Sequence, residues 1–215
     1  MSQVKSKQRV SDHGEVFTNE REVNAMLNLV KHETERIDSK FLEPACGTGN
    51  FLIEVLRRKL NVVQEKYKKA QLDFERNTLL AITSIYGIDL LEDNIIEARQ
   101  RLFNYAKEIY TKKFKEKSDE DFLKSLEFIL SKNLVQGNAL TMMCEPEKNG
   151  PIIFPEWEFI TKDKVKRRDF RFDHLMASAP IQELNLFSDL GDEAFIPTPT
   201  KDYQAQHYKE LFNYD

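Results

Sequence analysis

The fold is decided by one stretch of the sequence, which reads Phe41-Leu42-Glu43-Pro44-Ala45-Cys46-Gly47-Thr48-Gly49-Asn50-Phe51-Leu52. Its apolar start predicts a short strand, and apolar residues at helical spacing after Asn50 predict a helix to about Lys69. Between them, Gly47 and Gly49 let the backbone turn tightly and approach a ligand without an intervening side chain. A helix that begins after such a turn presents free N–H groups to a carboxylate or a hydroxyl.

Strands and helices alternate on both sides of this stretch. We therefore expect an α/β fold with a mostly parallel sheet and helices on both of its faces. The expected elements are a helix from Asn19 to Val30 with Asn19 as its N-cap, a strand at 84–88 that ends at Asp89, helices at Glu92–Lys115 and Asp119–Ser131, a third strand at 134–136 closed by Gly137-Asn138, a β-hairpin around Ile152–Phe159, a fourth strand from Phe172 to Ala177, and a short helix near Tyr203–Phe212.

Polar residues stand where the predicted strands end. These are Glu43, Asp89, Asn138 and Ser178. In parallel α/β sheets the ligand lies beyond the carboxyl ends of the strands. The coincidence indicates a nucleotide-like ligand at this edge of the sheet.

The composition is that of an ordinary globular domain. Of the 215 residues, 40% are hydrophobic and 32% charged, and no apolar run is long enough for a membrane span. The start of the chain does not resemble a secretory signal, and Cys46 and Cys144 form neither a disulfide pattern nor a zinc pattern, so we expect a cytoplasmic protein. The formal net charge is −4, so any attraction to phosphate must come from local patches. Residues 162–171, with six basic and two acidic side chains, form the one such candidate.

The stretch at 41–52 resembles the motif with which class I methyltransferases bind S-adenosylmethionine, in the form found in adenine-specific (N6) DNA methyltransferases of restriction–modification systems. The likeness extends from residue 14 to about 182. It implies a Rossmann-like methyltransferase sheet, S-adenosylmethionine as cofactor and DNA as partner. A flexible terminus at 1–13 is expected to precede a cofactor-binding domain at 14–215 that lacks a target-recognition domain.

Three further segments carry the resemblance. Asp89, after the second strand, is expected to accept hydrogen bonds from ribose hydroxyls. The alternative is that it caps the helix that begins near Glu92, a role that Asp93 could equally take. Residues 136–140 resemble the third-strand motif that meets the cofactor's adenine, and residues 14–18 resemble a segment that closes over the cofactor in one permuted class of these enzymes. The cofactor-binding residues implied are Phe17, Thr18, Glu43, Pro44, Ala45, Gly47, Gly49, Asn50, Phe51, Asp89, Leu90, Asn138 and Ala139.

The family pattern breaks at the expected catalytic loop. Family members have Asn or Asp, two prolines and an aromatic residue there, whereas this chain has Ser178, Ala179, Pro180 and Ile181. A short hydroxyl replaces the acceptor that orients the target amine, and such misplacement can cost on the order of a hundredfold in rate. Ile181 offers no ring for stacking on the flipped base, a loss of roughly 1–3 kcal/mol. We therefore predict impaired or absent catalysis.

The sequence leaves several interpretations open. The family's sheet continues beyond a fourth strand, so we expect an incomplete sheet whose exposed edge pairs with a second copy or a partner subunit. The chain could be a non-catalytic cofactor-binding or assembly subunit, or a methyltransferase acting on RNA or protein. A nicotinamide dehydrogenase is disfavoured because its fingerprint needs a third glycine where Leu52 stands.

Overall fold

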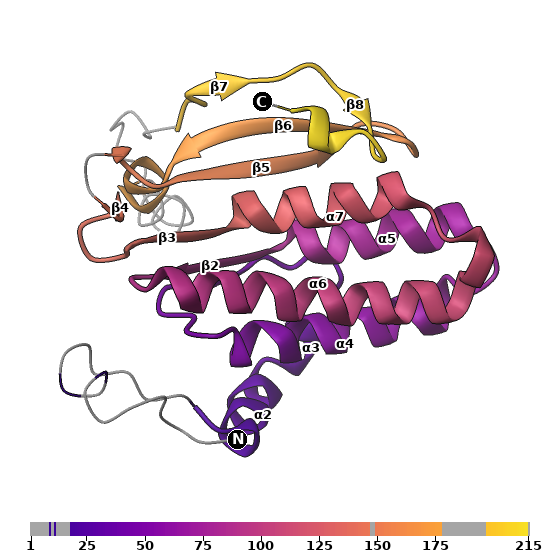
Figure 1. The fold of residues 1–215 in the computed structure, drawn as a ribbon, viewed down its shortest axis with the longest axis horizontal. Coiled ribbons are helices and arrows are strands. Elements are labelled where there is room, and N and C mark those ends of the chain that lie inside the picture. Colours follow the sequence, from indigo (N-terminus) through magenta and orange to yellow (C-terminus); the bar gives the residue numbers. More distant parts are fainter. Residues whose placement is uncertain (1–8, 10, 12–17, 147–148, 178–196, 215) are drawn as a thin grey trace, which may run out of the picture.

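The computed structural model describes residues 9 and 11 and the ranges 18–146, 149–177 and 197–214. The chain is a mixed α/β protein (Figure 1). Its elements are α2 (Glu20–Leu29), α3 (Lys31–Glu35), β1 (Phe41–Glu43), α4 (Asn50–Lys66), α5 (Gln71–Thr83), β2 (Ile85–Asp89), α6 (Glu92–Phe114), η1 (Lys115–Lys117), α7 (Glu120–Asn133), β3 (Leu134–Asn138), β4 (Met143–Cys144), β5 (Ile153–Phe159), β6 (Lys164–Arg171), β7 (Lys201–Asp202), β8 (Gln206–His207) and η3 (Leu211–Asn213).

Two helices begin where the sequence predicts. The side chain of Asn19 accepts a hydrogen bond from the backbone N–H of Glu22 at 3.0 Å, and α2 starts at the next residue. Asp119 caps α7 in the same way, through Phe122 N at 2.9 Å. In both cases a short polar side chain satisfies a backbone donor that has no partner inside the helix.

The first sheet has the strand order β1-β2-β3-β4. β1, β2 and β3 run parallel, whereas β4 pairs antiparallel with β3. The predicted α/β class is therefore confirmed, with a sheet that is mixed among the described residues.

The two faces of this sheet are covered by different structures. In Figure 1, α6 and α4 lie below β2 and β3, and the antiparallel pair β5–β6 lies above them. A Cβ added to Gly87 would meet Leu52 of α4 at 2.9 Å, so helix and strand are in close contact. From the other face, the Tyr86 ring packs edge-on against Phe154 of β5 at 5.3 Å, and its hydroxyl donates to Pro155 O. In the described part of the chain, the second face thus carries the hairpin together with the helical residues 172–177, whose Phe172 and Leu175 join the same apolar cluster as Tyr86.

A hairpin is present near the predicted place, with Ile153–Phe159 as its first strand only and Lys164–Arg171 as its second, but the predicted fourth strand is wrong. Residues 172–177 are helical. The reason is visible in the packing, because Phe172 and Leu175 both join the apolar cluster beneath the hairpin. Residues three apart share a face in a helix but point to opposite faces in a strand. The exposed sheet edge expected at this strand is therefore absent from the described residues, in which β1 and β4 are the two terminal strands of the first sheet.

The C-terminal segment adds two short strands to the sheet of β5 and β6 and does not form the predicted helix. β7 and β8 both pair with β6, and only the single turn of η3 is helical within 203–212. Tyr208 and Tyr214 are buried in the main core. The Tyr214 hydroxyl lies 2.7 Å from both Val165 O and Gln204 O, so its single proton is shared between two backbone acceptors. Because Tyr208 and Tyr214 are each held by their own contacts in the core, the backbone between them does not form a regular helix.

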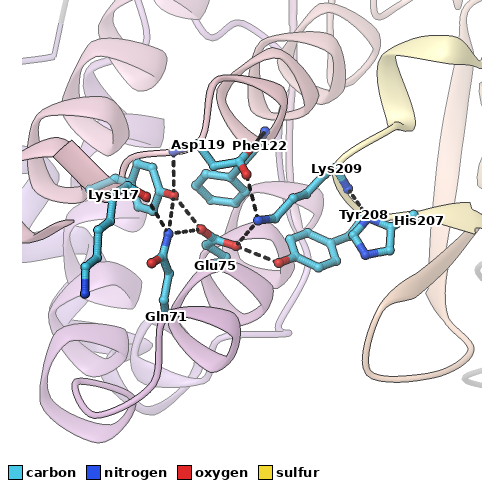
Figure 2. Close-up of polar contacts among 9 residues, drawn as sticks. Gln71, Glu75, Lys117, Asp119, Phe122, His207, Tyr208 and Lys209 are labelled. Carbon is cyan, nitrogen blue, oxygen red and sulfur yellow. Dashed lines mark hydrogen bonds and ion pairs between the residues drawn. The ribbon is translucent and has the colours of Figure 1, made fainter. Parts of the chain in front are cut away.

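A buried carboxylate joins this segment to the helices (Figure 2). Glu75 of α5 is 1% exposed and accepts hydrogen bonds from Gln71, from Tyr110 of α6 and from Tyr208, and it forms an ion pair with Lys209. The Tyr208 hydroxyl lies 2.6 Å from Glu75 Oε2, and Lys209 Nζ lies 3.2 Å from the same oxygen. We call these residues the Glu75 network. They tie the C-terminal segment to α5 and α6.

Among the described helices, none combines the length and the apolar character that crossing a membrane requires.

Candidate functional site

The glycine turn leads from β1 into α4. Gly47 and Gly49 have φ angles of 52° and 82°, in the left-handed region that glycine adopts without strain. A Cβ on Gly49 would also lie 3.2 Å from the Cβ of Ala98, so α6 packs directly against the turn. Because α4 starts at Asn50, its first backbone N–H groups have no partner inside the helix. The turn thus provides donors suited to an anionic group.

A cavity of about 540 Å³ lies where β1, β2 and β3 end. It is lined by Thr18, Met26, Glu43, Pro44, Ala45, Cys46, Gly47, Asn50, Phe51, Asp89, Leu90, Leu91, Asn94, Gly137, Asn138, Ala139 and Leu140. Pockets of roughly 300–1,000 Å³ enclose ligands of the size of a nucleoside cofactor. The three strand ends that the sequence singles out therefore meet at one cavity.

The Asp89 side chain accepts three hydrogen bonds at this cavity. Its Oδ2 accepts from Gly47 N at 2.8 Å, and its Oδ1 accepts from Leu91 N at 2.9 Å and from the Asn94 side chain at 3.1 Å. These bonds hold the glycine turn against the end of β2. A carboxylate has about four acceptor positions, so it can still accept a hydroxyl from a ligand. Asp89 therefore lies on the cavity wall and holds the turn. The helix-cap alternative is not found, because the N-cap of α6 is Leu91, which has no side-chain cap bond.

Glu43 and Cys46 are affected by burial at the same edge. Burial raises the pKa of the Glu43 carboxyl, and the N–H of Ala45 opposes this by donating to it. Burial also raises the pKa of the Cys46 thiol strongly, and the nearby carboxylates of Asp89 and Glu43 raise it further. A thiol that stays protonated is a poor nucleophile. Cys46 therefore serves packing, while the two carboxylates give the cavity its polar character.

Asn138 ends β3 on the third side of the cavity. Its side-chain oxygen accepts from Leu140 N at 2.9 Å and from Thr141 N at 3.3 Å. These two bonds shape the turn after β3 and occupy the acceptor half of the amide. The donor half is the part that can meet a ligand.

The cavity includes nearly all of the predicted cofactor residues. Gly49 is outside the lining residues because its role is in the turn itself. Phe17 lies outside the described residues, as do Ser178, Ala179, Pro180 and Ile181 of the expected catalytic loop. The contacts of the remaining residues with a cofactor stay predictions.

Sequence reasoning missed several lining residues. Met26 and Asn94 come from helices, and their spacing relative to the strand ends carries no motif. Asn94 could have been predicted, because it lies in the first turn of α6. That helix starts just after β2, so its first turn lies at the same edge of the sheet as Asp89. Leu140 is 92% exposed at the cavity, in a turn that the sequence marks only by Gly137-Asn138.

The basic stretch at 162–171 lies on β6 and its preceding turn, where carboxylates neutralise most of its charge. Arg167 is buried and bonds to Asp169 at 2.7 and 2.8 Å. The remaining ion pairs join Lys166 to Asp202, Arg168 to Glu156 and Glu158, and Arg171 to Asp173. These pairs weaken the case for a phosphate-binding patch on this strand.

Comparison with known proteins identifies the class of this site. Residues 17–149 match the MmeI DNA-methyltransferase domain, and the matched part contains all three strand ends that meet at the cavity. The chain belongs to this family of DNA methyltransferase domains. The resemblance to restriction–modification DNA methyltransferases is thereby confirmed.

A curated relative agrees with this assignment. The methylase subunit of the type I restriction enzyme MjaVII from Methanocaldococcus jannaschii is 39% identical over 88 residues, which are 38% of this chain. The match covers 14% of that subunit's own length. No solved structure gives a significant match to this chain.

Proposed function

We propose that this chain binds S-adenosylmethionine in the cavity at the carboxyl ends of β1, β2 and β3, as the cofactor domain of an adenine-N6 DNA methyltransferase. On this proposal, residues 14–215 form a cofactor domain with a Rossmann-like sheet. The observation that carries the proposal is the meeting of Glu43, the glycine turn, Asp89 and Asn138 at one cavity of suitable size. Membership of a DNA methyltransferase family supports the same cofactor.

The residues present fit this cofactor chemically. The N–H groups at the start of α4 suit its methionine carboxylate, and Glu43 suits its ammonium group. Asp89 suits the ribose hydroxyls, and the amide donor of Asn138 suits a ring nitrogen of the adenine. Leu90 is 44% exposed and offers an apolar side chain to a base. When bound, the cofactor supplies a methyl group on a positively charged sulfur.

DNA and a partner subunit are the proposed partners. The match to a type I methylase subunit supports both, because such a subunit is one part of a larger enzyme. Adenine as the target rests on the likeness of residues 41–52 to adenine-specific enzymes.

The loop Ser178-Ala179-Pro180-Ile181 leads us to propose that methyl transfer is impaired. A serine hydroxyl reaches less far than an amide, and it can donate its proton to the target amine where only acceptors are wanted. Isoleucine removes the ring on which a flipped base stacks.

The test is calorimetric titration of the chain with S-adenosylmethionine, with Asp89→Ala as the site variant and the exposed Glu127→Ala as the control. We expect binding by the wild type and the control, and a loss of about tenfold or more in the site variant. No binding by a folded wild-type chain at millimolar cofactor would refute the proposal.

A second candidate function is a non-catalytic cofactor-binding subunit, which the same degenerate loop favours. A tritiated methyl-transfer assay on DNA separates the two. Cofactor binding without transfer supports the non-catalytic subunit. Transfer that appears after Ser178→Asn, Ala179→Pro and Ile181→Tyr are combined supports a methyltransferase with an altered loop.

A further inference from the structure

Helix α6 contacts the glycine turn through one charged side chain. Nη1 of Arg101 donates to the carbonyl oxygen of Thr48 at 2.6 Å, to the Thr48 hydroxyl at 3.1 Å and to Oδ1 of Asn50 at 2.9 Å. Thr48 stands between the two glycines of the turn. Ala98 and Leu102 of the same helix also pack against the turn. A Cβ added to Gly49 would lie 3.2 Å from the Ala98 side chain and 3.4 Å from the Leu102 side chain. Arg101 is therefore the polar centre of the contact between α6 and the turn.

The Asn50 amide continues this contact toward the N-terminal segment. While Oδ1 accepts from Arg101, Nδ2 donates to the backbone oxygen of Thr18 at 3.0 Å. Thr18 and Asn50, the two residues that this bond joins, both line the cavity. Because both ends of the amide are engaged by the protein, Asn50 acts as a bridge. Asn50 therefore connects the N-terminal segment to Arg101 as well as lining the cavity.

The placement of Arg101 is unusual for a residue that only stabilises a helix. Its guanidinium lies at the N-terminus of α4, where the helix dipole disfavours a positive charge. An anion bound at the same terminus would reverse that disadvantage. Arg101 is outside the residues that line the cavity, so it would act on a ligand through the turn and through Asn50.

We propose that Arg101 is a positioning residue for the methionine half of the cofactor, which holds the Gly47–Gly49 turn and, through Asn50, the Thr18 end of the N-terminal segment in the binding arrangement. This inference rests on the proposed function. It concerns a residue that no motif in the sequence marks and that lies about 50 positions along the chain from the turn.

The test compares two probes, S-adenosylmethionine and 5′-methylthioadenosine, which lacks the amino-acid part. We expect Arg101→Gln to raise the Kd of S-adenosylmethionine about tenfold, as loss of a charge-assisted hydrogen bond does, and to leave the Kd of 5′-methylthioadenosine within about twofold. Arg101→Lys, which keeps the charge but not the fork of donors, should restore part of the loss. Equal changes for both probes, or no change for either, would overturn the proposal.

The matched control is Arg99→Gln on the same helix. Arg99 also donates to backbone carbonyls, those of Ser131 and Leu134, but away from the glycine turn. We expect this variant to lower thermal stability without a selective loss of S-adenosylmethionine. A selective loss in Arg99→Gln equal to that in Arg101→Gln would also count against the proposal.

Two further variants keep the test decisive. If Arg101→Gln does not fold, Asn50→Ala must show the same selective loss, and its absence overturns the proposal. If both fold, the double variant should lose less than the product of the two single losses, because the residues share one contact. A wild-type chain that binds neither probe would refute the proposed function itself, an outcome distinct from a failure of the Arg101 inference.

Discussion

Polar groups are used in two different ways in this protein. At the carboxyl ends of β1, β2 and β3, the carboxylates of Asp89 and Glu43 hold the turns beside them and still face a cavity. In the Glu75 network and around Lys59, the polar groups are buried and face other protein groups. Lys59 of α4 is fully buried, and its amine donates to Ile37 O, to Ser39 O and to the Ser84 hydroxyl at the amino ends of β1 and β2.

The difference shows what each region is for. Polar groups that are fully satisfied inside the protein fix how segments pack, because an unpaired partner left behind in the core is costly. Polar groups that retain spare hydrogen-bonding capacity at a cavity are available to a ligand. We expect substitutions in the closed regions to change stability, and substitutions at the cavity to change binding.

The largest effect on stability should come from Glu75→Gln. The variant removes the charge that Lys209 pairs with and places an amide against hydroxyl donors, so we expect a loss of about 3 kcal/mol in the free energy of unfolding. Urea unfolding measures it, with the exposed Glu127→Gln on α7 as control, expected to change by less than about 0.5 kcal/mol. Equal unfolding midpoints in both variants would show that the Glu75 network does not stabilise the fold.

The second prediction concerns Lys59 and pH. Burial lowers the pKa of Lys59 from 10.5 to about 7. Above pH 7 the folded protein has released this proton while the unfolded chain still holds it, so stability rises with pH through this window. The rise is up to about 1.4 kcal/mol per pH unit. We expect urea unfolding between pH 6.5 and 8.5 to show this rise in the wild type and a flatter dependence in Lys59→Met. Parallel curves for the two proteins would contradict the prediction.

A smaller effect separates two glycines of similar conformation. Gly49 and Gly150 have φ angles of 82° and 84°, but a Cβ at Gly49 would crowd Ala98, whereas a Cβ at Gly150 would meet nothing within 4 Å. Alanine at either position carries the strain of the left-handed region, roughly 1–2 kcal/mol. We expect Gly49→Ala to cost about 1 kcal/mol more than Gly150→Ala, and to weaken cofactor binding as well. Matched thermal unfolding and titration would show whether the crowding matters.

The smallest effect is expected on β6. Because Arg168 is paired with Glu156 and Glu158, Arg168→Ala should change nonspecific DNA affinity by less than about threefold. Fluorescence anisotropy at low salt provides the measurement. A tenfold loss of DNA affinity would contradict the prediction and would support residues 162–171 as a phosphate-binding patch.

Much of the cavity could be predicted from the sequence because its parts are local. A strand, a left-handed glycine turn and a helix follow from residues 41–52, and Asp89 and Asn138 follow from the ends of two apolar strands. The fourth strand could not be predicted in this way. The stretch from Phe172 to Ala177 is apolar enough for a strand, and only its position over the hairpin cluster makes the helix favourable. The C-terminal segment was mispredicted for the same reason, since its tyrosines are anchored by residues far away in the chain.

The sequence by itself determined the α/β class, the glycine turn, the strand-end carboxylates and the family, because each of these depends on neighbouring residues and their spacing. Only the tertiary structure decided that Arg101 supports the turn, that Asn50 bridges it to Thr18, that the basic stretch is neutralised, and that Glu75 joins α5 to Tyr208. The contacts of Asn50, Arg101 and Glu75 bring together residues from 32 to 133 positions apart. No local pattern encodes them, because they form only when the helices and the two sheets pack around a common core.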